Sequence, residues 1–150
     1  VSGVMNGGGW GLEADLLGGA ASIGRVGLQP LPCQGTNGTI LRAPAAGLDP
    51  GSTGTADVGA SVGRAWGVQR PNGLAKAWTQ GRVSEVTVGP LTLKGIVGRQ
   101  NVEQDRAGRI VRNDIRGSVV AEVVVDGESQ GKVTPGNARP LSGLNCKPLR

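Results

Sequence analysis

The stretch at residues 117–131, GSVVAEVVVDGESQG, places an apolar run directly before the dipeptide Asp126-Gly127. Both residues of this dipeptide tolerate the positive φ that a type I′ turn requires, so the stretch predicts a β-hairpin. Side chains alternate along a strand, and one face of the first arm is apolar throughout. The other face carries Val120 and Val124, so it is half apolar and also needs a cover.

Composition extends the β prediction to the whole chain. The 150 residues include 28 Gly, 9 Pro and 3 Trp, but no Phe, Tyr or His. Glycine is depleted in helix interiors and frequent in turns and bulges. Hydrophobic residues make up 37% and recur in alternating patterns, which argues against disorder. We expect an all-β protein, an antiparallel β-sandwich of the jelly-roll or Ig-like kind, with about eight to ten strands.

Alternating segments occur along most of the chain. Asn72-Gly73 follows a proline and predicts a turn between two long arms. A slip of phase near Gly24 predicts a β-bulge. No segment shows sustained helical periodicity. The expected strands lie within residues 9–19, 22–32, 39–42, 56–69, 74–89, 91–105 and 109–127.

Residues 1–9, VSGVMNGGG, predict an extended N-terminal arm ahead of a single β-sandwich domain over residues 10–150. Such an arm can add a strand to the sheet edge of a neighbour, and a head-to-tail contact that does not close produces a filament. The leading hypothesis is therefore a secreted structural subunit that assembles with copies of itself at the cell surface. The alternative is that a second layer of the same domain covers the second valine face. The expected assembly interface consists of Val1, Val4, Met5, Val120 and Val124.

The chain has two cysteines, which are far apart in the sequence. Cys33 and Cys146 have no CxxC spacing, and the chain has no histidine to complete a zinc site. Two lone cysteines in an extracellular protein most simply form one disulfide, whereas in the cytosol they would be buried free thiols. We expect the disulfide, and we expect Val1 to follow a removed signal peptide. No apolar run approaches the roughly 20 residues of a membrane-spanning helix.

The net charge is +5, from 16 Lys and Arg against 11 Asp and Glu. Five arginines surround one predicted turn and alternate with acidic residues, which is typical of a solvated, ion-paired hairpin tip. The functional alternative is an anion-binding or partner-binding edge. A nucleic-acid partner is disfavoured, because single-strand binders use aromatic stacking platforms that this chain scarcely offers. The edge would consist of Arg99, Arg106, Arg109, Arg112 and Arg116.

The sequence predicts no enzyme, no cofactor and no metal site. Glu13 and Asp15 share one strand face, and paired carboxylates can hydrolyse glycosides, but a solvated polar face is the simpler interpretation. The loop at residues 48–57 holds two aspartates without the dense oxygen ligands of a calcium loop. Asn37 begins a glycosylation sequon, which we expect to be unmodified in a bacterial product.

A second hypothesis uses the three tryptophans. Trp10, Trp66 and Trp78 would form a sugar-stacking surface if they were exposed, although large aromatic residues are more often part of a core. The protein would then be a monomeric extracellular binding module for an anionic or saccharide ligand of the cell envelope.

Four motifs along the chain form a pattern: GWGLEADLLGG at residues 9–19, PLPCQG at 30–35, VTVGPLTLKGI at 86–96 and VVVDG at 123–127. This pattern resembles that of the secreted actinobacterial proteins called choice-of-anchor P. The resemblance spans most of the chain. It implies a signal peptide, an all-β extracellular domain and a surface or exported role, and it transfers no catalytic residues.

Overall fold

The computed structural model describes residues 5–16, 21–47 and 57–137. These residues form twelve strands and no helix, with all strand pairs antiparallel and the sheets packed together as in a β-sandwich. The predicted all-β class is confirmed. The strand count exceeds the expected range because three of the strands, at 8–9, 29–30 and 57–58, have only two residues.

The strand bounds follow the predicted segments closely. None of the described residues belongs to a helix that is long and apolar enough to cross a membrane. The strands are β1 Gly8–Gly9, β2 Leu12–Leu16, β3 Ala21–Val26, β4 Gln29–Pro30, β5 Leu41–Ala45, β6 Asp57–Val58, β7 Ser61–Gln69, β8 Ala75–Val88, β9 Leu91–Gln104, β10 Ile110–Asp114, β11 Val119–Val125 and β12 Glu128–Val133.

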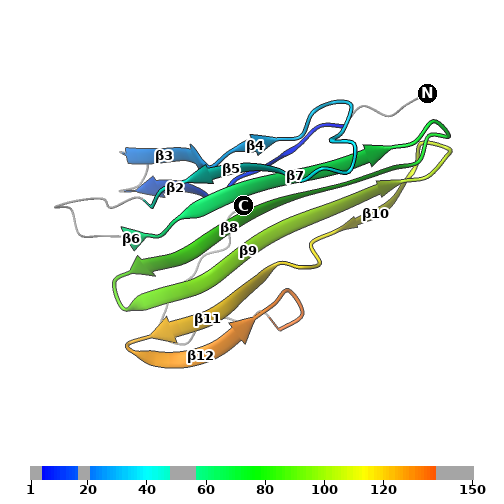
Figure 1. The fold of residues 1–150 in the computed structure, drawn as a ribbon. Helices are drawn as coiled ribbons and strands as arrows, with labels where there is room; N and C mark the ends of the chain where they lie inside the picture. The colour runs from blue at the N-terminus through cyan, green and yellow to red at the C-terminus, as the bar shows by residue number, and fades with distance from the viewer. Residues whose placement is uncertain (1–4, 17–20, 48–56, 138–150) are drawn as a thin grey trace.

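The main sheet has the order β12-β11-β9-β8-β7-β5, with β10 beside β9 and β6 beside β8 (Figure 1). The order follows the chain, which refines the expected jelly-roll or Ig-like arrangement to an up-and-down meander. The predicted turns form it: Gly73 has φ 83°, and Asp126 and Gly127 have φ 51° and 81°. These positive values are the ones that glycine and aspartate tolerate best.

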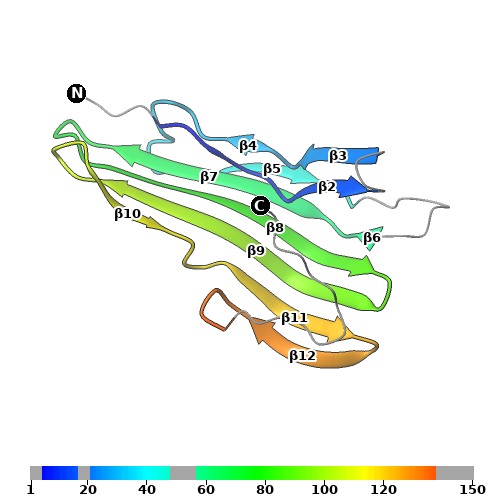
Figure 2. The same ribbon diagram turned by 180° about the vertical axis from the view of Figure 1, so that it is seen from behind.

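Residues 5–16 and 21–33 form a second layer, which we call the N-terminal hairpin. In it β1 pairs with β4 and β2 pairs with β3. The register shifts between Leu12 opposite Val26 and Ala14 opposite Ile23, as the predicted bulge near Gly24 requires. The hairpin contacts β5, β7 and β8, and both ribbon views show β11 and β12 at the opposite margin of the main sheet (Figures 1 and 2).

The two layers touch through their backbones. A Cβ atom on Gly63 would overlap the carbonyl oxygens of Gly9 and Gly27, and a Cβ atom on Gly81 would overlap the carbonyl of Trp10. Sheets with ordinary side chains pack about 10 Å apart. Glycine on both sides therefore lets the N-terminal hairpin approach the main sheet more closely than side chains would allow.

The prediction of an extended N-terminal arm is corrected at Met5. This residue is only 7% exposed and lies in a core cluster with Leu31 and Ala65 of its own chain. Its backbone N–H also donates to the carbonyl of Cys33 at 3.0 Å. Gly67 of β7 leaves room for the Met5 thioether, because a Cβ at that position would lie 2.7 Å from the sulfur. Val1 and Val4 lie outside the described residues.

Val120 and Val124 are half-buried, and they pair in register with Ile96 and Thr92 of β9. The N-terminal hairpin lies at the other margin and makes no substantial contact with β11. The described residues thus supply no second layer over these valines. Their role as an assembly interface stays a prediction.

Candidate anion-binding face

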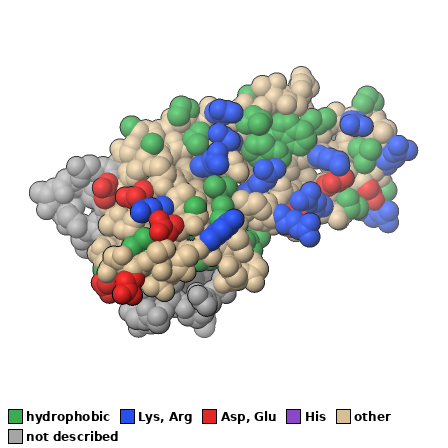
Figure 3. All heavy atoms as spheres, turned by 60° about the horizontal axis from the view of Figure 1, so that its bottom comes forward, with side chains coloured by type: hydrophobic (Ala, Val, Ile, Leu, Met, Phe, Trp, Pro, Cys, Tyr) green, Lys and Arg blue, Asp and Glu red, His purple; other side chains and the backbone are tan. Residues whose placement is uncertain are grey.

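The face of the main sheet opposite the N-terminal hairpin is basic. Burial alternates along β7, so that Arg64 and Trp66 turn away from the hairpin. Cross-strand pairing then places Arg42, Arg64, Gln80 and Arg99 directly opposite one another across four strands. In Figure 3, Lys and Arg side chains lie on both sides of an apolar patch on one face of the molecule. We call this surface the arginine face and define it by Arg42, Arg64, Arg82, Arg99, Trp66 and Trp78.

Arg64 is the centre of a group of three like charges. Burial lowers the pKa of its guanidinium, and the nearby charges of Arg42 and Arg82 lower it further. The Nε atom of Arg64 is buried and has no hydrogen-bond partner. Within the described residues, no carboxylate forms an ion pair with any of these three arginines. Like charges held together in this way attract an anion from outside.

The two tryptophans of the arginine face stack on each other across β7 and β8. Their ring centroids are 6.3 Å apart and their planes differ by 15°. The guanidinium carbon of Arg99 lies 4.4 Å from the ring centroid of Trp78. Stacking and cation–π attraction fix this arrangement. The Trp78 ring is therefore already in contact with both Trp66 and Arg99.

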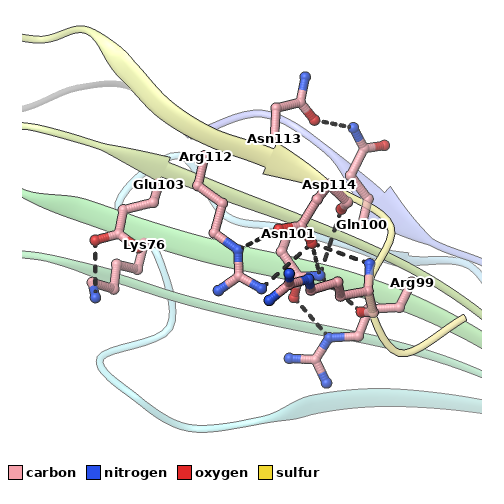
Figure 4. A network of polar contacts seen from close by, with 9 residues as sticks. Lys76, Arg99, Gln100, Asn101, Glu103, Arg112, Asn113 and Asp114 are labelled. Atoms are coloured by element: carbon pink, nitrogen blue, oxygen red, sulfur yellow. Dashed lines mark hydrogen bonds and ion pairs between the residues drawn. The ribbon is translucent and has the colours of Figure 1, made fainter.

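A polar network extends the arginine face onto β10 (Figure 4). Arg99 Nε donates to Asn101 Oδ1 at 2.8 Å, and Asn101 Nδ2 donates to Asp114 Oδ1 at 2.9 Å. Arg112 Nε pairs with Asp114 Oδ2 at 2.6 Å, and Lys76 pairs with Glu103 at 2.9 Å. The bond from Arg112 is the largest cause that lowers the pKa of Asp114, to about 2. The acids at this end of the face are thus already paired.

Most of the five arginines expected at one edge are not brought together as a site. Arg109 pairs with Asp105 at 2.9 Å and Arg112 with Asp114, which is the ion-paired hairpin tip that the interleaved charges favour. Arg106 lies in the turn between β9 and β10, and the Arg116 N–H donates to Asp114 Oδ1. Only Arg99 belongs to the arginine face.

The remaining predicted sites are resolved only in part. Glu13 and Asp15 lie in β2, but their side chains are outside the described part, as are residues 48–56. In the described ranges, no three His, Cys, Asp or Glu residues gather as a metal site would require. Cys33 is exposed, whereas Cys146 lies outside the described residues, so their disulfide stays a prediction.

Sequence reasoning missed Arg42, Arg64 and Arg82 as site residues. Alternation along residues 56–69 places Arg64 and Trp66 on one face, which is a local signal for Arg64 alone. The partners come from β5 and β8, and their positions depend on cross-strand register. A signal for Arg82 was present in the hairpin turn at residues 70–73, which fixes the pairing of Val62 with Arg82.

No family model matches this chain, and neither a curated protein nor a solved structure matches it. The resemblance to the choice-of-anchor P proteins stays a prediction from motifs. The arrangement of the described side chains carries the functional argument.

Proposed function

We propose that this protein is a monomeric binding module for a linear anionic polysaccharide of the cell envelope. One observation carries the proposal: the guanidinium groups of Arg42, Arg64 and Arg82 stand together without a carboxylate partner among the described residues. Charge-assisted hydrogen bonds from arginine to carboxylate are among the stronger polar contacts in proteins. An anionic ligand would relieve the mutual repulsion of these three groups.

The length of the arginine row favours a polymer over a single anion. Arg42 and Arg99 occupy the ends of a row that crosses β5, β7, β8 and β9. Three strand spacings of about 4.8 Å separate them, or about 14 Å. One carboxylate cannot reach both ends, whereas consecutive acidic sugars can. The ligand would then lie across the strands, alongside the stacked tryptophans.

The test measures the affinity of the protein for polygalacturonate and for neutral dextran of similar length. We expect binding to polygalacturonate alone, weakening as salt rises from about 50 to about 200 mM, because salt screens the arginines. Arg64→Gln should lower the affinity about tenfold, since it removes a charged hydrogen-bond donor. Its fold should survive, because the Arg64 Nε has no partner to lose.

Arg106→Gln is the matched control, with the same loss of charge at the exposed tip between β9 and β10. It should leave the affinity nearly unchanged. Equal losses in the two variants would mean that net charge alone attracts the polymer, and the arginine face would not be its site.

A self-assembling structural subunit is the second candidate, and the edge strand β10 favours it. Ile110, Val111 and the adjacent Ile115 are 57%, 59% and 54% exposed, and β10 pairs with β9 alone. An exposed apolar edge is a template for strand addition from another copy. Light scattering decides between the candidates: a monomer of 15.1 kDa supports the binding module, and an oligomer dispersed by Val111→Lys supports assembly.

Both candidates place the protein outside the cell, and we propose that Cys33 and Cys146 form a disulfide there. The exposure of Cys33 supports this pairing, because an exposed cysteine is accessible to a partner thiol.

A further inference from the structure

A groove runs beside the N-terminal hairpin on the face of the main sheet opposite the arginine face. Two hollows of about 420 and 400 Å³ share Gly8, Trp10, Thr79 and Gln100 in their linings, so they form one continuous depression. The hairpin forms one wall, and β8 and β9 form the floor. We call this depression the Trp10 groove and define it by Trp10, Ala77, Thr79, Gln100, Val102 and Gln104.

The side chains that enter the Trp10 groove are uncharged. Lys76 and Arg99 are the only charged residues among the described residues that line the two hollows. Both use their side chains on the arginine face, where Lys76 pairs with Glu103 and Arg99 stacks on Trp78. Arg25 adds a guanidinium beside the groove, against the Trp10 ring, but the floor of the groove on β8 and β9 carries no other charged side chain among the described residues. Its ligand is therefore recognised by hydrogen bonds and ring contact rather than by charge.

The polar groups of the groove are amides and hydroxyls. Gln100 Nε2 donates to Asn113 Oδ1 at 2.8 Å, which orients its amide, and Gln104 Nε2 donates to the carbonyl of Gly73 at 3.4 Å. The amide carbonyl oxygens of both residues have no partner among the described hydrogen bonds, so they can accept from a ligand hydroxyl. Thr79 adds a hydroxyl that both donates and accepts.

Trp10 supplies the aromatic surface at the junction of the two hollows. The guanidinium carbon of Arg25 lies 4.2 Å from the centroid of its ring, which holds the indole in place. A Cβ on Gly9 or Gly11 would meet the backbone of the main sheet or Ser61, so the chain on both sides of Trp10 lies close against that sheet. Trp10 itself lines both hollows.

From this combination we infer that the Trp10 groove binds a neutral oligosaccharide. A sugar ring has an apolar face that packs on an indole and a rim of hydroxyls that pair with amides. A charged polymer would meet one guanidinium at the groove, that of Arg25, which already lies against the Trp10 ring. A purely apolar ligand would leave the two glutamine amides unpaired. The Trp10 groove is separate from the arginine face, so the test of this inference does not depend on the proposed function.

The experiment follows the three indole N–H signals by two-dimensional ¹H–¹⁵N NMR, assigned by single Trp→Phe variants. Cellohexaose, laminarihexaose, maltohexaose and chitohexaose are added in turn to the full chain. At least one should shift the Trp10 signal saturably with a dissociation constant below about 1 mM, while the Trp66 and Trp78 signals stay in place. Polygalacturonate should leave the Trp10 signal unmoved.

Two variants test the assignment. Gln100→Leu should weaken the binding about tenfold, because a buried hydroxyl loses its acceptor. Gln130→Leu is the matched control, at an exposed position on β12 that lines neither hollow, and it should leave the binding unchanged. The inference is overturned if none of the four glycans moves the Trp10 signal. It is equally overturned if an extended peptide such as (Val-Thr)5 moves that signal and the glycans do not, because the groove would then accept a strand.

Discussion

At the scale of single residues, two neighbouring glycines differ in whether the fold requires a glycine at that position. Gly81 and Gly98 are directly paired on β8 and β9. A Cβ on Gly81 would overlap the carbonyl of Trp10, whereas a Cβ on Gly98 would meet nothing within 4 Å. The same residue type therefore has a structural role at one position and none at the other.

Gly81→Ala should lower the free energy of unfolding by about 1–3 kcal/mol or more, because backbone on both sides prevents relaxation. Gly98→Ala should leave it unchanged or slightly raised, since alanine loses less conformational entropy on folding. Chemical denaturation of the two variants measures the difference. Equal stabilities would mean that the N-terminal hairpin does not pack on β8 as described.

Single residues also show which features the sequence can predict and which it cannot. Asn72-Gly73 and Asp126-Gly127 fix their turns locally, because few residues adopt positive φ, and the structure confirms both. Met5 was placed on a free arm because nothing local shows that Gly67, on a strand far along the chain, leaves room for its sulfur.

At the scale of elements, β10 pairs with β9 through the backbone, and polar side chains add further hydrogen bonds between the two strands. Asn101 is 7% exposed and donates to Asp114 Oδ1 and to the carbonyl of Arg116, each at 2.9 Å. All residues of β10 except Asp114 are exposed. The charge state of the Asp114 carboxylate therefore affects the side-chain contacts of this strand.

The hydrogen bond from Arg112, with smaller help from Arg116 and Asn101, lowers the pKa of Asp114 from 3.8 to about 2. A lowered folded-state pKa means that its stabilisation is present above the ordinary value of 3.8 and is lost as the pH falls through about 2. Titration of the Asp114 carboxyl ¹³C signal should give a midpoint near 2. Arg112→Gln should raise that midpoint toward 3.8, while Arg109→Gln should not; a wild-type midpoint near 3.8 would contradict the network.

The arginine face shows why elements are easier to predict than the sites they build. Alternation predicted β7 and β8, and the turn at residues 70–73 fixed their pairing. Arg42 joins the face only because β5 pairs with β7, and the chain between those strands passes through residues 46–60. No local pattern states the register of a strand pair separated by so long a connection.

At the scale of the whole molecule, two chemically different faces lie on opposite sides of one sheet. The arginine face is basic, and the Trp10 groove is lined mainly by uncharged residues. A protein with both proposed sites occupied would connect a charged polymer to an uncharged one, which suits the proposed binding module.

The proposed disulfide belongs to this scale, because Cys33 and Cys146 enclose 112 residues. In denaturant without reductant, no thiol should react with a thiol reagent, and after reduction two should react. Reduction should lower the free energy of unfolding by about 4–5 kcal/mol in the chain-entropy model. Two reactive thiols before reduction would exclude the disulfide, and a dimer that dissociates on reduction would place it between copies.

The glycine contact between the two layers also has a thermal consequence. When the N-terminal hairpin packs on the main sheet, the surface removed from water consists more of peptide groups than of hydrocarbon, because backbone meets backbone at Gly9, Gly63 and Gly81. Apolar and polar surface change the heat capacity of unfolding in opposite directions. The free energy of unfolding of this chain should therefore vary less steeply with temperature than that of a protein of equal length with a core of large side chains.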